Sequence, residues 1–181
     1  MRNSLRRLIT LTIATVVAGL FGTAAGFAAV IAAAGGPLLR IDTRSSTDVA
    51  STSSTSFVNL PNAHVRIVIP ATGGSRLVVA RFSAESTCGG TSLPSFCQVR
   101  IIAFNTGTSV TTEMHPQAGV NFAFDSVSVP AGASDAAEGH SVERSLRLDP
   151  GTYLIRVQWA VTAADTNFNL DDWHLTVSQY D

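Results

Sequence analysis

Hydrophobic and polar residues alternate along most of the chain beyond residue 57, in short runs separated by glycine, proline, asparagine and aspartate. Such alternation predicts β-strands, because successive side chains of a strand point to opposite faces. No convincing amphipathic helix follows residue 57. The predicted strands are His64–Ile69, Arg76–Ala84, Cys97–Phe104, Ser109–Met114, Val120–Ser128, Ser141–Leu148, Thr152–Thr162 and Phe168–Ser178.

Strands of this number and length, separated by turn signals, predict an all-β fold. We expect a two-sheet antiparallel β-sandwich of the jelly-roll type, preceded by one N-terminal hydrophobic helix. An immunoglobulin-like strand order is the alternative, although its usual Cys…Trp…Cys spacing is missing. Trp159 lies in the apolar phase of its strand and is expected in the core.

The last predicted strand changes phase in its middle. Trp173 and Leu175 share one face, whereas Phe168 and Leu170 have the opposite parity. A slip of one residue moves a strand's side chains to the other face. The pattern therefore predicts a β-bulge near Asp171-Asp172.

Two predicted strands are apolar on both faces, although a sandwich strand usually has one face in water. The second faces carry Leu77 and Val79 in one strand and Ile102 and Phe104 in the other. A loop, the N-terminal segment or another subunit must cover them. These four residues are the candidate interface for a second subunit.

The N-terminal part of the chain is apolar. Arg2, Arg6 and Arg7 precede an uncharged stretch that ends at Leu39, and its apolar part is Leu8–Ala34. As a helix rising ~1.5 Å per residue, that part would be about 40 Å long, more than the ~30 Å core of a bilayer. The basic flank predicts a cytoplasmic N-terminus, with the rest of the chain outside.

Two interpretations of this segment remain open. A retained signal-anchor fits its length and would hold the C-terminal domain at the cell membrane, outside the cytoplasm. A cleaved signal peptide is the alternative, because Thr23-Ala24-Ala25 and Ala32-Ala33-Ala34 both resemble cleavage sites. Removal of residues 1–25 or 1–34 would leave a secreted protein.

Small residues recur every four positions within the apolar segment, at Ala14, Ala18, Gly22 and Gly26. They would lie on one face of a helix, where small side chains let membrane helices approach closely. This stripe is a candidate packing face. A segment so rich in alanine and glycine also produces such spacing by chance.

Residues 40–56 are polar, rich in serine and threonine, and have no apolar period. Such a stretch cannot bury enough surface to fold, so it predicts a flexible linker. The expected organisation is an N-terminal anchor or signal peptide at 1–39, a linker at 40–56 and a β-sandwich ectodomain at 57–181.

The two cysteines, Cys88 and Cys97, lie close together in the sequence. Outside the cytoplasm, an isolated pair of this kind usually forms a disulfide. We expect this disulfide to fix a hairpin-like connection between two central strands. The spacing is not C-x-x-C, which disfavours a redox or metal pair.

The charge of the chain excludes one class of function. All 12 basic residues are arginine, and residues 57–181 contain seven arginines against eleven acidic residues. No basic stripe is available to neutralise phosphates, so we expect no nucleic-acid binding.

No catalytic motif stands out. The sequence contains no nucleophile elbow, P-loop, H-E-x-x-H or EF-hand pattern, and its four histidines are not at ligand spacing. We therefore expect neither enzymatic activity nor a cofactor. A hydrolase whose Ser-His-Asp triad assembles from distant strands is a remaining alternative.

The best polar cluster combines Asp165, Asp171, Asp172 and His174 around the expected bulge. Carboxylates there could bind Ca²⁺ or hydrogen-bond to sugar hydroxyls. The favoured alternative is structural, with the aspartates capping the bulge and His174 in solvent. Arg144 has the inward phase of its own strand, and Asp171 or Asp172 is its expected acidic partner.

Two functions follow from these features. The first is a non-enzymatic domain that acts outside the cytoplasm through protein contacts, as a homo-oligomer in one version. The second is a carbohydrate-binding module, with or without Ca²⁺.

Overall fold

The computed structural model describes residues 34–117, 123–127 and 136–181. The predicted N-terminal helix, with Ala14, Ala18, Gly22 and Gly26, lies outside these residues. No helix in the described part of the chain is long and apolar enough to span a membrane.

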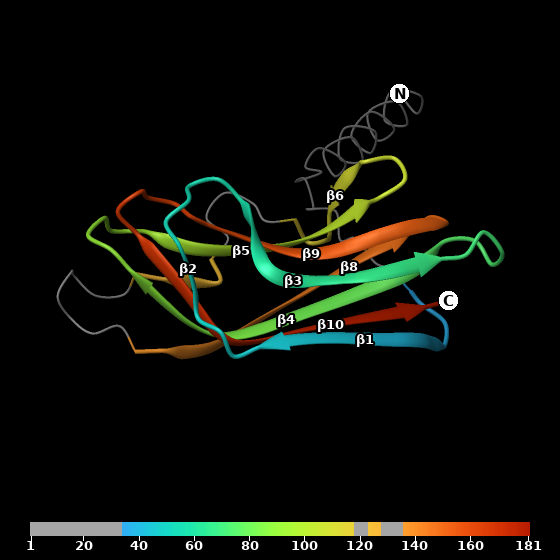
Figure 1. The fold of residues 1–181 in the computed structure, drawn as a ribbon, viewed down its shortest axis with the longest axis horizontal. Coiled ribbons are helices and arrows are strands. Elements are labelled where there is room, and N and C mark those ends of the chain that lie inside the picture. Colours follow the sequence, from blue (N-terminus) through green and yellow to red (C-terminus); the bar gives the residue numbers. More distant parts are fainter. Residues whose placement is uncertain (1–33, 118–122, 128–135) are drawn as a thin grey trace, which may run out of the picture. The chain divides into compact units, whose positions relative to one another are not determined.

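The described residues form two antiparallel sheets, in which every named strand pairs with its neighbours through backbone hydrogen bonds (Figure 1). Sheet A contains β1 (Leu38–Ser46), β10 (Asn167–Tyr180), β4 (Arg76–Gly89) and β8 (Glu138–Leu148) in that order, with β2 (Ala50–Thr52) beside β10. Sheet B contains β3 (Val58–Ile69), β9 (Gly151–Val161), β5 (Phe96–Asn105) and β6 (Thr111–Glu113), with β7 (Asp125–Ser126) beside β5.

The path of the chain between the sheets defines the fold. The chain alternates between the two sheets. It passes from β1 in sheet A to β3 in sheet B, returns to β4 in sheet A, and continues to β5 and β6 in sheet B. It then forms β8 in sheet A, β9 in sheet B and β10 in sheet A. The resulting orders, β1-β10-β4-β8 and β3-β9-β5-β6, are those of a jelly roll. The predicted all-β sandwich is confirmed, and the immunoglobulin-like order is wrong.

The core lies between the sheets, where the alternating residues of each strand meet. Trp159 and Trp173 are both only 2% exposed, as expected from their phase. The ring of Phe168 packs 5.5 Å from that of Trp159, and Phe82 lies 6.4 Å from Trp173, measured between ring centroids. These aromatic contacts join β10 to strands of both sheets.

The bulge in β10 lies where the phase change predicts it. The register with β4 shifts between Asp171 and His174, and Asp172 has a φ of 44°. The extra residue allows Leu170 before the bulge and Leu175 after it to be fully buried.

The predicted linker is the main error in the sequence analysis. Most of residues 40–56 belong to β1 and β2, which both pair with β10. β1 is an edge strand with mostly exposed side chains, so it carries no alternation of apolar residues. Backbone hydrogen bonds to β10 keep β1 in place. Such bonds are made by every residue type, so the sequence pattern does not reveal them.

The predicted disulfide is present, and it crosses the sandwich. Cys88 in β4 and Cys97 in β5 are bonded and almost fully buried. Since β4 belongs to sheet A and β5 to sheet B, the bond connects the two sheets at one end of the core. The connection that it closes is therefore a crossover between sheets, not a hairpin.

Reduction of this disulfide should lower the free energy of unfolding by about 2.5–3 kcal/mol, the loop-closure contribution for a short loop. The measurement is urea denaturation of the full chain in detergent, with and without reductant, followed by tryptophan fluorescence. Cys88→Ala/Cys97→Ala, which should behave like the reduced protein or be slightly less stable, is the matched control. Equal midpoints for oxidised and reduced chains would contradict the prediction.

Candidate functional site

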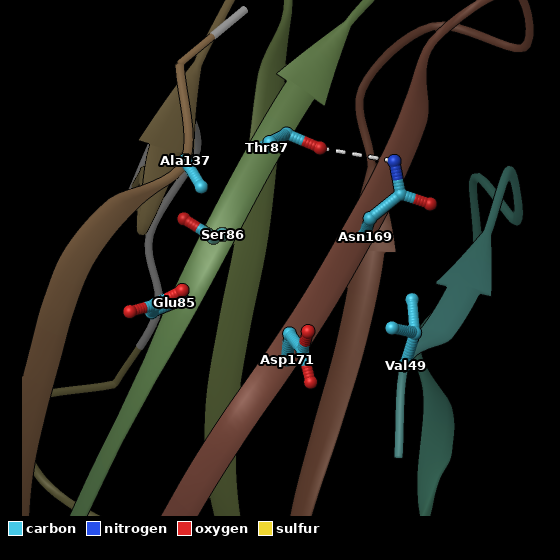
Figure 2. Close-up of a pocket in the computed structure, with 7 residues that line it drawn as sticks. All are labelled: Val49, Glu85, Ser86, Thr87, Ala137, Asn169 and Asp171. Atoms are coloured by element: carbon cyan, nitrogen blue, oxygen red, sulfur yellow. Dashed lines mark hydrogen bonds between the residues drawn. The ribbon is translucent and has the colours of Figure 1, made fainter. Parts of the chain in front are cut away.

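A hollow of about 270 Å³ opens on the outer face of sheet A, beside the β10 bulge. Figure 2 shows its walls, which come from β4, β10 and the segments just before β2 and β8. Its lining residues are Val49, Glu85, Ser86, Thr87, Ala137, Asn169 and Asp171. It is the described cavity that lies nearest to the predicted polar cluster.

Two carboxylates lie side by side in this hollow. Asp171 on β10 is the direct cross-strand partner of Glu85 on β4. Like charges at such positions destabilise a strand pair, because their side chains are only about 5 Å apart. Asp171 also accepts a hydrogen bond from the backbone N–H of Asp172, at 2.8 Å, within the bulge.

The next pair along the strands is held by hydrogen bonds. The Asn169 side-chain amide donates to the Thr87 hydroxyl at 3.0 Å, the dashed line in Figure 2. Its carbonyl oxygen accepts from the Ser51 hydroxyl at 2.6 Å and from the Asn167 amide at 3.0 Å. The orientation of Asn169 is therefore fixed, and the hollow presents acceptors and a hydroxyl in a defined arrangement.

The structure separates the four residues of the predicted polar cluster. Asp171 lines the hollow, Asp172 is the bulge residue, and His174 is exposed on the outer face. Asp165 lies in the β9–β10 loop, before β10 begins at Asn167, and it does not line the hollow. No group of three or more His, Cys, Asp and Glu side chains in the described ranges could hold a metal ion.

Asp165 instead joins two loops. Its carboxylate accepts hydrogen bonds from the backbone N–H of Thr91, at 3.2 Å, and from the Thr91 hydroxyl. The hydrogen bond from the Thr91 hydroxyl, followed by one from Ser92, holds the pKa of the Asp165 carboxyl below its usual value. The loop that the disulfide closes is thus attached to the β9–β10 loop.

Sequence reasoning missed a second polar group, formed by Ser86, Asp125 and His140. The Ser86 hydroxyl donates to Asp125 at 2.7 Å and lies 2.9 Å from Nδ1 of His140. Because its one proton goes to Asp125, His140 Nδ1 must donate to Ser86. The residues come from β4, β7 and β8, far apart in the sequence, so no motif could reveal them.

This group does not have the arrangement of a catalytic triad. In a triad the imidazole accepts the serine proton, whereas here that proton is committed to a carboxylate. Ser86 is also only 2% exposed, at the base of the hollow. The geometry is that of a structural network that satisfies polar groups at the edge of the core.

The four candidate interface residues do not share one surface. Leu77 and Val79 belong to β4 in sheet A, and Ile102 and Phe104 belong to β5 in sheet B. All four lie outside the core between the sheets, so the two pairs face opposite sides of the sandwich.

Contacts within the chain cover at least part of these faces. A Cβ placed on Gly35 would lie 3.0 Å from Leu77, so the backbone of Gly35 packs directly against that side chain. The Arg156 guanidinium lies 4.7 Å from the centroid of the Phe104 ring. Val79 lines a second hollow of about 240 Å³, together with Arg81 and others.

Arg144 points inward as predicted and is 6% exposed. Its Nη1 donates to the carbonyl of Glu143 at 2.8 Å. Burial lowers the pKa of this guanidinium, and the charge of Glu113 opposes that effect. The predicted ion pair between Arg144 and Asp171 or Asp172 is wrong. Arg144 is on β8 and both aspartates are on β10, and β4 lies between these two strands.

The exposed apolar residues lie elsewhere. Large hydrophobic side chains exposed in the described part of the chain are Leu38, Leu39, Ile41, Val49, Val58, Val68, Leu93 and Val110. Three of them, Leu38, Leu39 and Ile41, belong to β1. This concentration lies on β1, most of which falls within the predicted linker.

Neither a family model nor a curated protein matches this sequence. Solved structures that align with it include dimeric latent PorU from Porphyromonas gingivalis, with 12% identity over 83% of this chain and a TM-score of 0.34. This chain spans only 14% of that PorU chain.

Two smaller proteins also align. Eiger TNF from S. frugiperda has 11% identity and a TM-score of 0.34 over 74% of this chain and 92% of its own. The CBM22-1 xylan-binding domain of Paenibacillus barcinonensis Xyn10C has 15% identity and a TM-score of 0.28. The alignment covers 80% of this chain and 96% of that domain.

Asp165→Asn should reduce the loss of stability in acid. Because the pKa of Asp165 is lower in the folded than in the unfolded state, its contribution is present above about pH 4 and is lost as the pH falls through the folded value. The measurement is the urea midpoint of the full chain in detergent between pH 6 and 2. Asp149→Asn, at an exposed position, is the control and should retain the steeper fall. Parallel curves for wild type and Asp165→Asn would contradict this role.

Proposed function

We propose that this protein is a non-enzymatic β-sandwich domain that acts outside the cytoplasm by binding protein through the open edge of β1. The observation that carries the proposal is the exposed, apolar edge of that strand, which pairs with no other strand in the described part of the chain. Leu38, Leu39 and Ile41 are 47%, 44% and 54% exposed, although all three belong to a regular strand.

The described edges of the two sheets differ in how they are protected. At the β8 edge, Ser145 exchanges two backbone hydrogen bonds with His115, each 2.9 Å long. In β3, the edge strand of sheet B, Pro61 cannot donate to a ladder and Asn62 has a φ of 61°. Bulges, prolines and covering segments are the usual ways in which proteins block edge pairing.

Among residues 34–117, 123–127 and 136–181, none pairs with or blocks the outer edge of β1 over most of its length. Its register with β10 is uninterrupted from Arg40 to Ser46, and it contains no proline. A regular edge strand presents a row of N–H and C=O groups that can pair with a strand from another protein. The apolar side chain of Ile41 adds surface that such a partner would bury.

The proposed location outside the cytoplasm has separate support. The Cys88–Cys97 disulfide is buried between the sheets, and disulfides of this kind form and persist in oxidising compartments. We propose that the apolar segment before the first strand, Leu8–Ala34, acts as a signal-anchor that holds the domain at the membrane. Cleavage after residue 25 or 34 would give a secreted form.

A second candidate function is carbohydrate binding in the hollow beside the β10 bulge. The favouring observation is the fixed arrangement of Glu85, Thr87, Asn169 and Asp171, whose oxygens could accept hydrogen bonds from sugar hydroxyls. The described lining contains no aromatic ring on which a sugar could stack. Protein binding is therefore the preferred function.

A photo-crosslinking amino acid in place of Ile41 should form a covalent adduct with another protein chain, a second copy included. The full chain is expressed in the cells that normally produce it, illuminated, and analysed by denaturing gel and mass spectrometry. The same group at Val68, which is 53% exposed on β3, is the matched control and should give at least about tenfold less adduct. Equal yields at both positions, or none at Ile41, would overturn the proposal.

The carbohydrate candidate has its own test. A glycan array probed with the full chain in detergent, with and without chelator, should show binding that Glu85→Gln/Asp171→Asn abolishes. An array without signal in both conditions would remove this candidate for the glycans tested.

A further inference from the structure

We propose that the partner of β1 is a second copy of the same chain, paired antiparallel with it about a two-fold axis at Thr43. This inference rests on the proposed function and adds the identity and register of the partner. In this arrangement sheet A continues from one copy into the other.

Symmetry limits the possible registers. Two copies that continue one antiparallel sheet are related by a two-fold axis perpendicular to the sheet, so each axis passes through a residue that faces itself. The regular part of β1 runs from Arg40 to Ser46, and its centre is Thr43. An axis there pairs all of these residues, from Arg40 with Ser46 to Thr43 with itself. The register shift between Leu38 and Arg40 lies outside the paired segment.

The charges of β1 complement themselves in this register. Asp42 lies opposite Arg44 of the second copy, and Arg44 lies opposite its Asp42. Arg40 forms an ion pair with Asp42 within its own strand, with Nη2–Oδ1 and Nε–Oδ2 distances of 2.7 Å. The two strands would therefore bring together positive and negative side chains in alternation, which stabilises a strand pair.

Neighbouring registers are worse. An axis at Asp42 places the two Asp42 carboxylates opposite each other and Arg40 opposite Arg44. An axis at Arg44 or at Ser45 pairs fewer residues of β1 with the second copy. An axis at Arg44 also places the two Arg44 side chains opposite each other. An axis at Ile41 pairs Arg40 with Asp42, but it brings the irregular segment at Leu38–Arg40 into the ladder. Thr43 is thus the centre that combines full pairing with opposite charges.

The surroundings of Arg44 agree with a carboxylate partner. The pKa of His64 on β3 lies below its usual value, first because the ring is partly buried and then because Arg44 and Arg156 are close. Arg44 is therefore close enough to the His64 ring for a positive charge on each to repel the other. Asp42 of a second copy would place a negative charge beside Arg44 and reduce that repulsion.

The outer face of the paired strands fits the same arrangement. Ile41 pairs with Ser178, and Thr43 with Thr176, in the ladder between β1 and β10. Two β-branched Thr43 side chains would meet at the axis, with Ile41 of each copy packed diagonally against Thr43 of the other. Cross-strand contacts between β-branched residues stabilise sheets.

Thr43→Cys tests the register directly. Paired residues of an antiparallel ladder have Cα atoms about 4.5–5.5 Å apart, within the range for a disulfide. Mild oxidation of the full chain in detergent should therefore give a covalent dimer. Ile41→Cys is the matched control, because in this register its two copies lie about 13 Å apart, four strand positions at ~3.3 Å each.

The native disulfide does not interfere, because Cys88 and Cys97 are bonded and buried. Any association of the N-terminal segments would affect both variants equally, so the contrast between positions 43 and 41 reports on β1. A dimer with Ile41→Cys but not with Thr43→Cys would overturn the register, and no dimer with either would overturn self-pairing.

Charge reversal provides an independent test. Asp42→Arg and Arg44→Asp should each reduce the dimer, measured by analytical ultracentrifugation in detergent, by roughly tenfold or more, because each opposes like charges twice. A mixture of these two variants should restore association as a heterodimer. The double variant Asp42→Arg/Arg44→Asp should dimerise like the wild type and shows that the substitutions leave the domain folded. A mixture that fails to associate, or undiminished single variants, would contradict the proposal.

The two proposals fail in different ways. If Thr43→Cys gives no dimer while the crosslinker at Ile41 captures a different protein, self-pairing is wrong and protein binding through β1 stands. If Ile41 captures nothing, protein binding through this edge is wrong as well.

Discussion

The pairing of β10 with β1, β2 and β4 is the constraint on which the rest of this domain depends. β10 must bury Phe168 and Leu170 before its middle and Trp173 and Leu175 after it, although the two pairs have opposite parity. The extra residue at Asp172, with its positive φ, resolves this conflict. A strand without the bulge would expose one pair, at a cost of about 1.5–3 kcal/mol for each large side chain.

The bulge also divides the outer face of sheet A. On one side, Asp171 and Asn169 lie over β4 and beside β2, and they form the walls of the hollow (Figure 2). On the other side, β10 runs in regular register against β1. The hollow therefore lies on one side of the bulge, and the regular ladder with β1 lies on the other.

The predictable features of this chain are those with a local signature in the sequence. Alternation identified the long strands, the phase change between Leu170 and Trp173 located the bulge, and the short spacing of Cys88 and Cys97 gave the disulfide. β1 escaped because an edge strand buries little, so nothing in its side chains marks it. The Ser86–Asp125–His140 network and the hydrogen bonds of Asp165 escaped because they join segments that only the fold brings together.

The assignment of β1 changes what the N-terminal segment can do. A flexible linker at residues 40–56 would let the domain move freely relative to the N-terminal segment. Because β1 begins at Leu38, only a few residues lie between the end of the apolar segment at Ala34 and the first strand. A ladder of seven residues buries less than the ~800 Å² per partner of a standard interface, so the pairing is expected to be weak in solution. Copies held in one membrane would pair at a much higher effective concentration. In the proposed membrane-held dimer, the membrane would supply the proximity and the charges of Asp42 and Arg44 would select the register.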